Sequence, residues 1–92
     1  MDYTKDLLFE WDEKKSQDCF RRRGFNFQLA TEVFHDPMRI ILEDERFTYS
    51  EQRWLCYGKI NNRLHCVVFT LRDNRIRIIS ARKANRREAR KL

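Results

Sequence analysis

The sequence predicts an α+β fold of two N-terminal helices, a four-stranded antiparallel sheet and a C-terminal helix. Apolar residues recur at helical spacing before Pro37, whereas after it they follow the shorter period of strands. Two pairs of turn-forming residues, Asn61-Asn62 and Asp73-Asn74, separate consecutive strand-like runs, and strands joined this way pair antiparallel. Only two Gly and one Pro occur in 92 residues, which argues against a disordered chain. We expect one small domain over residues 1–92.

The first predicted helix covers residues 13–23. A short strand or extended lead-in from Leu7 to Trp11 leads to Asp12, whose side chain suits an N-cap. The last turn carries Arg21-Arg22-Arg23, which matches the negative end of the helix dipole. Gly24 follows, at the position where a left-handed residue commonly ends a helix.

The second helix begins at Asn26, which is a suitable cap, and ends before Pro37. It carries one apolar stripe, formed by Leu29, Ala30, Val33 and Phe34. Four strands are then predicted, over residues 38–42, 52–57, 64–71 and 75–81, and Gly58 closes the second of them. Asn85 and Glu88 have the spacing of a capping box and start a helical tail.

The positive charge is concentrated at the C-terminus. The chain has 20 Lys and Arg against 14 Asp and Glu, a net charge of +6. Residues 72–92 hold nine basic and two acidic residues, a balance of +7, and so residues 1–71 hold eleven against twelve, a balance of −1. Such a localised charge indicates a polyanion or an acidic protein as partner, although a solvated basic helix end is the simpler alternative.

Cysteine and histidine usage gives no metal-site pattern. Cys19, Cys56 and Cys66 lack CxxC spacing, and His35 and His65 are far apart in sequence. We interpret the thiols as buried structural groups. No glycine-rich phosphate loop, HExxH or GxSxG occurs, and no metal or cofactor is predicted. The charged N-terminus excludes the apolar core of a signal peptide, and no apolar run could span a bilayer, so we expect a cytoplasmic protein without membrane contact.

The last strand carries the candidate polyanion contacts. Alternation predicts that Ile76, Ile78 and Ser80 point to the core and that Arg75, Arg77 and Ile79 point the opposite way. The two guanidiniums, about 6–7 Å apart, can straddle a phosphodiester.

The preceding strands supply further candidates. If Arg53 shares the face of Arg77, that face combines guanidiniums with Tyr57 or Phe69 for base stacking. The alternative is that these are surface arginines paired with nearby acids, namely Glu43, Asp44, Glu45 or Glu51.

Such a surface suits RNA cleavage without a metal ion. The RNA supplies its own 2′-hydroxyl nucleophile, so the protein has to orient the backbone, stabilise the phosphorane and assist proton transfer. Arg and Lys meet the first two needs. His65 is close to the arginine-rich strand in sequence, but we interpret it as a structural histidine. Glu10, Asp12 and Glu13 form no evident acid/base pair and are explained by the start of the first helix.

Several segments together resemble the BrnT toxins. The motifs run in the family order across nearly the whole chain from about residue 8. They are Phe9-Glu10-Trp11-Asp12-Glu13-Lys14-Lys15; Gly24, Phe27, Ala30, Val33-Phe34 and Asp36-Pro37; Glu51, Arg53 and Gly58; and Ile76-Arg77-Ile78-Ile79-Ser80-Ala81-Arg82-Lys83-Ala84 with Glu88. No single segment would be sufficient, but the combination is specific.

The resemblance implies a RelE-like fold and an endoribonuclease toxin of a type II toxin–antitoxin system that arrests growth. It also implies a BrnA antitoxin whose ribbon-helix-helix part binds operator DNA and which holds the toxin in a heterotetramer that represses the shared operon. Catalytic residues carried over are Arg53, Arg77 and Arg82. Glu51 is the candidate base, with Tyr49 as the alternative. Arg75, Lys83 and Tyr57 are the expected RNA contacts.

Two positions depart from the family pattern. Arg22-Arg23-Gly24 stands where Lys-His-Gly is usual, and Phe47 stands where a histidine often follows Asp44. Imidazole is the usual proton-transfer group near neutral pH. An alternative function is therefore a catalytically impaired BrnT-like subunit that acts mainly by binding the antitoxin in operon autorepression. A third, a stand-alone nucleic-acid-binding protein, rests on the charge alone.

Overall fold

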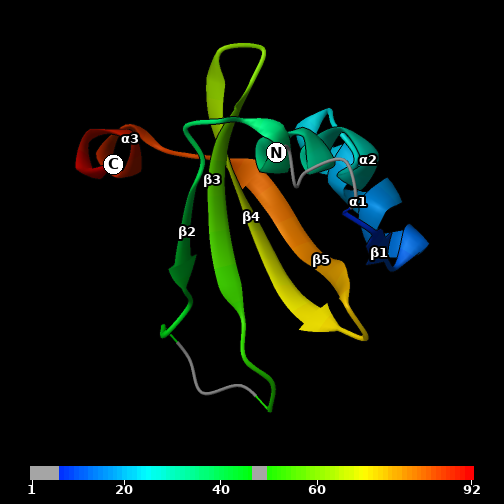
Figure 1. Cartoon of the computed structure of the whole chain (residues 1–92). Coiled ribbons are helices and arrows are strands. Elements are labelled where there is room, and N and C mark those ends of the chain that lie inside the picture. The colour runs from blue at the N-terminus through cyan, green and yellow to red at the C-terminus, as the bar shows by residue number, and fades with distance from the viewer. Residues whose placement is uncertain (1–6, 47–49) are drawn as a thin grey trace.

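The computed structural model describes residues 7–46 and 50–92, and its α+β architecture confirms the predicted class (Figure 1). The elements in chain order are β1 (Phe9–Trp11), α1 (Glu13–Arg23), α2 (Phe27–Ala30), the 3-10 helix η2 (Thr31–His35), β2 (Ile40–Glu43), β3 (Trp54–Ile60), β4 (Arg63–Arg72), β5 (Arg75–Lys83) and α3 (Arg86–Lys91).

The sheet has five strands in the order β1-β5-β4-β3-β2. The predicted antiparallel meander is confirmed for β2 to β5, and both tight turns have left-handed backbone, with φ of 49° and 65° at Asn61 and Asn62. The predicted sheet was nevertheless incomplete, because β1 pairs with β5 in parallel and makes the sheet mixed. A three-residue strand is too short to show alternation, so its pairing could not be read from the sequence.

The first helix forms as predicted. The Asp12 side chain accepts hydrogen bonds from the backbone N–H groups of Lys14 and Lys15, and Gly24 ends α1 at φ 83°. The second helix is shorter than expected, since only α2 is α-helical and η2 continues as a 3-10 turn. The Thr31 hydroxyl donates to the Gln28 carbonyl at 2.7 Å, and β-branched residues in this segment favour the helix weakly.

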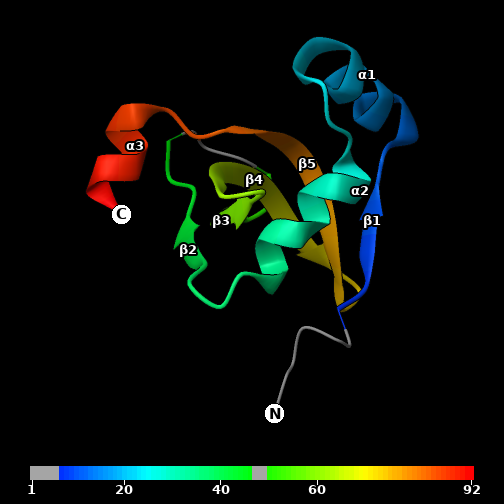
Figure 2. The same cartoon turned by 90° about the horizontal axis from the view of Figure 1, so that it is seen from above.

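Helices α1, α2 and η2 cover one side of the sheet, the helix face, which holds the main core (Figure 2). The helices contribute Cys19, Phe25, Phe27, Ala30, Val33 and Phe34, and the strands contribute Cys56, Ile60, Val67, Phe69, Ile76, Ile78 and Ala81. Phe69 therefore belongs to the core and is not available for base stacking, contrary to one of our expectations.

Gly58 lies inside β3 and does not end it as predicted, since the strand runs on to Ile60. A Cβ atom at Gly58 would be 2.5 Å from the carbonyl oxygen of Val33 and 2.8 Å from its Cα. The glycine therefore allows η2 to pack directly on the strand backbone.

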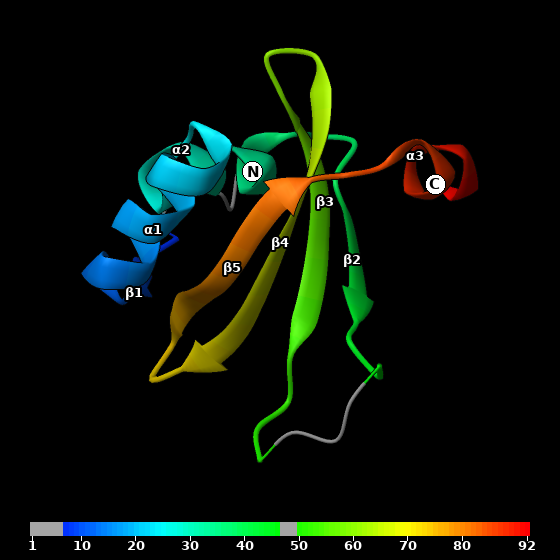
Figure 3. The same cartoon turned by 180° about the vertical axis from the view of Figure 1, so that it is seen from behind.

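The other side of the sheet, the open face, carries a smaller apolar cluster. Its buried members are Leu55, Tyr57, Cys66, Val68 and Ala84, with Leu64 and Ile79 packed against them. Seen from behind, this face lies between α1 on one side and α3 on the other (Figure 3).

A β-bulge interrupts β5 and changes the direction of its side chains. Ile78 pairs with Phe69 and Ser80 with Val68, so Ile79 is the extra residue. The predicted core position of Ser80 is therefore wrong: Ser80 is exposed and lies opposite Val68, a residue of the open face. The bulge also puts Arg82 on the same face as Arg77, although the two are five positions apart, a spacing that regular alternation would put on opposite faces.

The three cysteines are free and buried, which confirms their structural interpretation. Burial raises the pKa of the Cys56 thiol from 9.0 to about 12. Among the helices of the described residues, none has the length and apolar character needed to cross a membrane.

Candidate functional site

Four side chains form a row across the open face, one from each of four neighbouring segments. Arg77 of β5 pairs with Glu10 of β1 on one side and with Thr70 of β4 on the other. Arg53 directly precedes Trp54, which pairs with Phe69, and this register puts Arg53 beside Thr70. Arg53 and Arg77 therefore share a face, as the sequence analysis required, with one strand between them.

Each of these arginines has an acidic neighbour. Arg77 Nη1 is 3.8 Å from Glu10 Oε2, and Arg53 Nη2 is 3.7 Å from Glu51 Oε1. The side chains of Arg53 and Arg77 are 27% and 30% exposed, so both are partly buried and still reach solvent. The predicted alternative, arginines paired with nearby acids, thus describes part of the arrangement.

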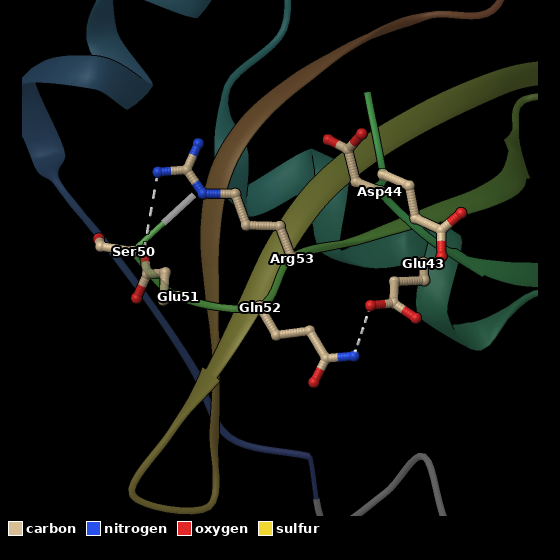
Figure 4. A pocket seen from close by; sticks show the side chains of 7 residues that line it. Glu43, Asp44, Ser50, Glu51, Gln52 and Arg53 are labelled. Carbon is tan, nitrogen blue, oxygen red and sulfur yellow. Dashed lines mark hydrogen bonds and ion pairs between the residues drawn. The ribbon is translucent and has the colours of Figure 1, made fainter. Parts of the chain in front are cut away.

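The segment before β3 is held in place by its own polar contacts (Figure 4). The Thr70 hydroxyl donates to the carbonyl of Gln52 at 2.6 Å, and the Gln52 amide donates to Glu43 at 2.9 Å. These bonds fix the backbone between Glu51 and Arg53, and so they fix the direction of both side chains.

A second row lies one pleat period further along the strands. Arg72 pairs with Arg75 across the β4–β5 turn, and Arg72 Nη2 is 3.2 Å from Glu51 Oε2. Glu51 therefore stands between Arg53 and Arg72. Arg75 is exposed at the end of the row.

The two rows together present four guanidiniums and two carboxylates. Neighbours along a strand are about 7 Å apart, and positions separated by one strand are on the order of 10 Å apart. Long arginine side chains can bridge that distance onto one phosphodiester and its neighbours. This arrangement of guanidinium groups can hold an RNA backbone and stabilise the negative charge that develops on the phosphoryl oxygens.

A third polar group lies beyond the bulge and joins α3 to the sheet. Arg82 Nη1 and Nη2 donate to the two carboxylate oxygens of Glu88 at 2.6 and 2.8 Å, and the Tyr57 hydroxyl donates to Glu88 Oε2 at 2.7 Å. The hydrogen bonds from Arg82 lower the pKa of Glu88 from 4.5 to about 2. Burial, assisted by the Glu88 contact, raises the pKa of Tyr57. Tyr57 is 7% exposed, so its ring does not offer a free stacking surface.

Lys83 and His65 lie on the helix face, away from the arginine rows. The two residues pair across β4 and β5, and the His65 ring contacts Phe25 edge-on at 5.1 Å. His65 is 5% exposed, and its Nδ1 is 2.7 Å from the Arg63 carbonyl oxygen. Desolvation lowers the pKa of His65. These contacts are those of a structural histidine, which was the preferred interpretation.

A basic hollow between α1 and β5 was not predicted from the sequence. Its lining includes the side chains of Lys15, Arg22 and Arg23 beside the bulge. Arg23, which stands where the family pattern has histidine, donates from Nη1 to the Ala81 carbonyl at 2.5 Å. The run of three arginines before Gly24 was a usable signal, but it was assigned to the helix dipole alone. Phe47, the other departure, and Tyr49, the alternative base candidate, lie outside the described residues.

Within residues 7–46 and 50–92, no three His, Cys, Asp or Glu side chains gather as ligands for a metal ion would.

A family model described as the ribonuclease toxin BrnT of type II toxin–antitoxin systems matches residues 11–88, which is most of the chain. No curated protein matches the chain as a whole.

Proposed function

Because the chain belongs to the BrnT family of ribonuclease toxins of type II toxin–antitoxin systems, we propose that it is an endoribonuclease that cleaves RNA on its open face. We further propose that cleavage needs no metal ion and that it inhibits translation and growth. The observation that carries this proposal is the row in which Arg53 and Arg77 flank Thr70.

In the proposed reaction the 2′-oxygen of the RNA attacks the adjacent phosphorus. The bond between phosphorus and the 5′-oxygen breaks, which leaves a 2′,3′-cyclic phosphate and a 5′-hydroxyl end. Glu51 accepts the 2′-hydroxyl proton, and solvent water protonates the leaving oxygen. Arg53 and Arg77 hold the non-bridging oxygens and stabilise their growing charge.

The other predicted residues take supporting roles in this proposal. Arg75 extends the row and binds the neighbouring phosphate. Lys83 binds the part of the RNA backbone that continues around the end of the sheet, since the Lys83 side chain is on the helix face. Arg82 and Tyr57 are also proposed RNA contacts, but Glu88 occupies them in this conformation.

The second partner we propose is a BrnA-like antitoxin with a ribbon-helix-helix part. A type II toxin is paired with an antitoxin, and the basic C-terminal segment offers a surface that acidic side chains of the antitoxin can bind. We propose a heterotetramer that contacts operator DNA through the antitoxin.

Induced expression of the chain in bacterial cells tests the activity. Growth should stop and transcripts should be degraded, and co-expression of the antitoxin should restore growth. The variant R77A, produced to the same level, should be harmless. Normal growth with the unaltered protein at a verified level would overturn the toxin proposal.

One observation favours a second candidate, a catalytically impaired subunit. The chain has two histidines, and neither is on the open face: His65 packs against Phe25, and His35 ends η2 on the helix side. In that case antitoxin binding and operator repression persist while RNA stays intact. RNA cleavage measured beside a reporter fused to the operator distinguishes the two, because an impaired subunit strengthens repression by the antitoxin while it leaves RNA intact.

A further inference from the structure

The carboxylate of Glu88 is bound in the way that proteins bind an anion. Both its oxygens accept hydrogen bonds from the Arg82 guanidinium, at 2.6 and 2.8 Å. Oε2 also accepts from the Tyr57 hydroxyl at 2.7 Å, and Oε1 from the Asn85 backbone N–H at 3.0 Å. A planar fork of two N–H donors with an added hydroxyl suits a phosphate as well as a carboxylate.

The floor of this arrangement belongs to the sheet and does not depend on α3. Tyr57, Cys66 and Arg82 are register partners on β3, β4 and β5. Tyr57 is buried, and Cys66, on the strand between the other two, is fully buried. The Arg82 side chain, by contrast, is 32% exposed. The donors are therefore preorganised by the fold, and the guanidinium can be reached from solvent.

Helix α3 is fastened to this floor through Glu88. None of its six residues, all of them described, is buried. Apart from Glu88 and Ala89 its residues are cationic: Arg86, Arg87, Arg90 and Lys91. A short helix without buried apolar side chains has little packing to hold it once its ion pair is exchanged.

We propose that Arg82 and Tyr57 form a binding site for an RNA phosphate, which the Glu88 carboxylate fills until the RNA displaces it together with α3. This inference rests on the proposed function, because it assigns a second phosphate site to the same face. It accounts for the position of Arg82 on the open face and for the hydrogen bond from Tyr57 to Glu88, whose place the phosphate takes when α3 leaves. The four cations of α3 then stay near the RNA on a short tether.

An internal competitor lowers the apparent affinity by the fraction of molecules in which the site is open. If about one molecule in ten is open, removal of the carboxylate strengthens phosphate binding at this site on the order of tenfold. Removal of the Arg82 guanidinium abolishes the gain.

The first test uses inorganic phosphate as the probe and does not require catalysis. Thermal unfolding of the full chain is followed as phosphate is raised at constant ionic strength. E88A should reach a given gain in melting temperature at about tenfold lower phosphate than the unaltered protein, whereas the double variant E88A/R82A should lose this difference. Equal responses of the three proteins would overturn the proposal. If E88A does not fold, the same comparison uses E88Q, which keeps a side chain able to bond to Tyr57 and Asn85.

Acetate is run in parallel, because an acidic protein segment is the other anion that could replace Glu88. Stabilisation of E88A by acetate but not by phosphate would contradict an RNA site and indicate a carboxylate partner.

The second test measures binding of an RNA oligonucleotide whose 2′-hydroxyls are methylated, so that it cannot be cleaved. E88Q should bind it on the order of tenfold more tightly than the unaltered protein. E32Q is the control, since Glu32 is exposed on η2 and its removal changes the net charge equally. A gain that E32Q reproduces, or weaker binding by E88Q, would overturn the proposal. If instead the proposed function is wrong, R77A leaves RNA binding unchanged, whatever effect phosphate has on E88A.

Discussion

Arg53 and Arg77 point from the same face of the sheet, with Thr70 between them on the intervening strand. The two arginines come from segments more than twenty residues apart. The hydrogen bond from Thr70 to the Gln52 carbonyl fixes the backbone next to Arg53. Of their flanking acids, Glu51 belongs to the segment that also holds Arg53, whereas Glu10 comes from β1. The site therefore exists only in the folded chain, and each of its parts can be tested separately.

Replacement of Arg53 or Arg77 by Ala should weaken binding of a non-cleavable RNA. Each change removes a phosphate contact, so the slope of log affinity against log salt should fall by about one unit. Fluorescence anisotropy at several salt concentrations measures it. R63A is the matched control, since Arg63 is exposed at the β3–β4 turn. An unchanged slope in R77A would place the RNA elsewhere.

E51Q should slow RNA cleavage while it leaves RNA affinity nearly unchanged. The amide keeps the size of the side chain and cannot accept the 2′-hydroxyl proton, so the rate should fall by about 100-fold or more. Single-turnover cleavage gives the rate, and anisotropy gives the affinity. E43Q is a suitable control, because Glu43 lines the same pocket as Glu51 but bonds to Gln52. Full activity of E51Q would remove Glu51 from the mechanism.

G58A should destabilise the fold by about 3 kcal/mol, because its methyl group would overlap the Val33 carbonyl and force η2 away from β3. G24A should cost about 1 kcal/mol, since that site has space but a left-handed backbone. Urea unfolding measures both free energies. If G58A were no worse than G24A, the contact between η2 and β3 would be looser than described.

Acid should reduce stability through His65. Burial lowers its pKa in the folded protein, so the unfolded chain binds the proton more readily. The contribution is fully present above the ordinary value of 6.5 and is lost as the pH falls below it toward the folded pKa. The free energy of unfolding between pH 7.5 and 5.5 should drop in the unaltered protein and in H35Q, whose replaced side chain is exposed. A drop of the same size in H65Q would assign the effect to other groups.

Local chemistry made much of the fold predictable. Asp12 and Gly24 cap α1 as expected, and Asn85 and Glu88 form the capping box. Both tight turns are at the predicted pairs, Asn61-Asn62 and Asp73-Asn74. Each of these signals depends on residues within four positions of one another. The α+β class followed because helical and strand periods occupy separate halves of the chain.

The remaining features depend on contacts between distant segments. The parallel pairing of β1 with β5 is set by packing of Phe9 and Trp11 on the helix-face core. The sequence of a three-residue strand is too short to predict this packing. The bulge at Ile79 reverses the alternation that placed Ser80 in the core, and no glycine marks it. Glu88 was predicted as a capping residue, but its bond to Arg82 requires the path that the chain takes after β5.

Cleavage of a labelled RNA by the purified protein in excess EDTA tests the central claim most directly. The account predicts cleavage that leaves a 2′,3′-cyclic phosphate, that fails when the nucleotide before the cut carries 2′-hydrogen, and that is lost in a folded R53A/R77A variant. Intact RNA after incubation with the folded, unaltered protein would contradict it. So would cleavage that the double variant performs at the same rate.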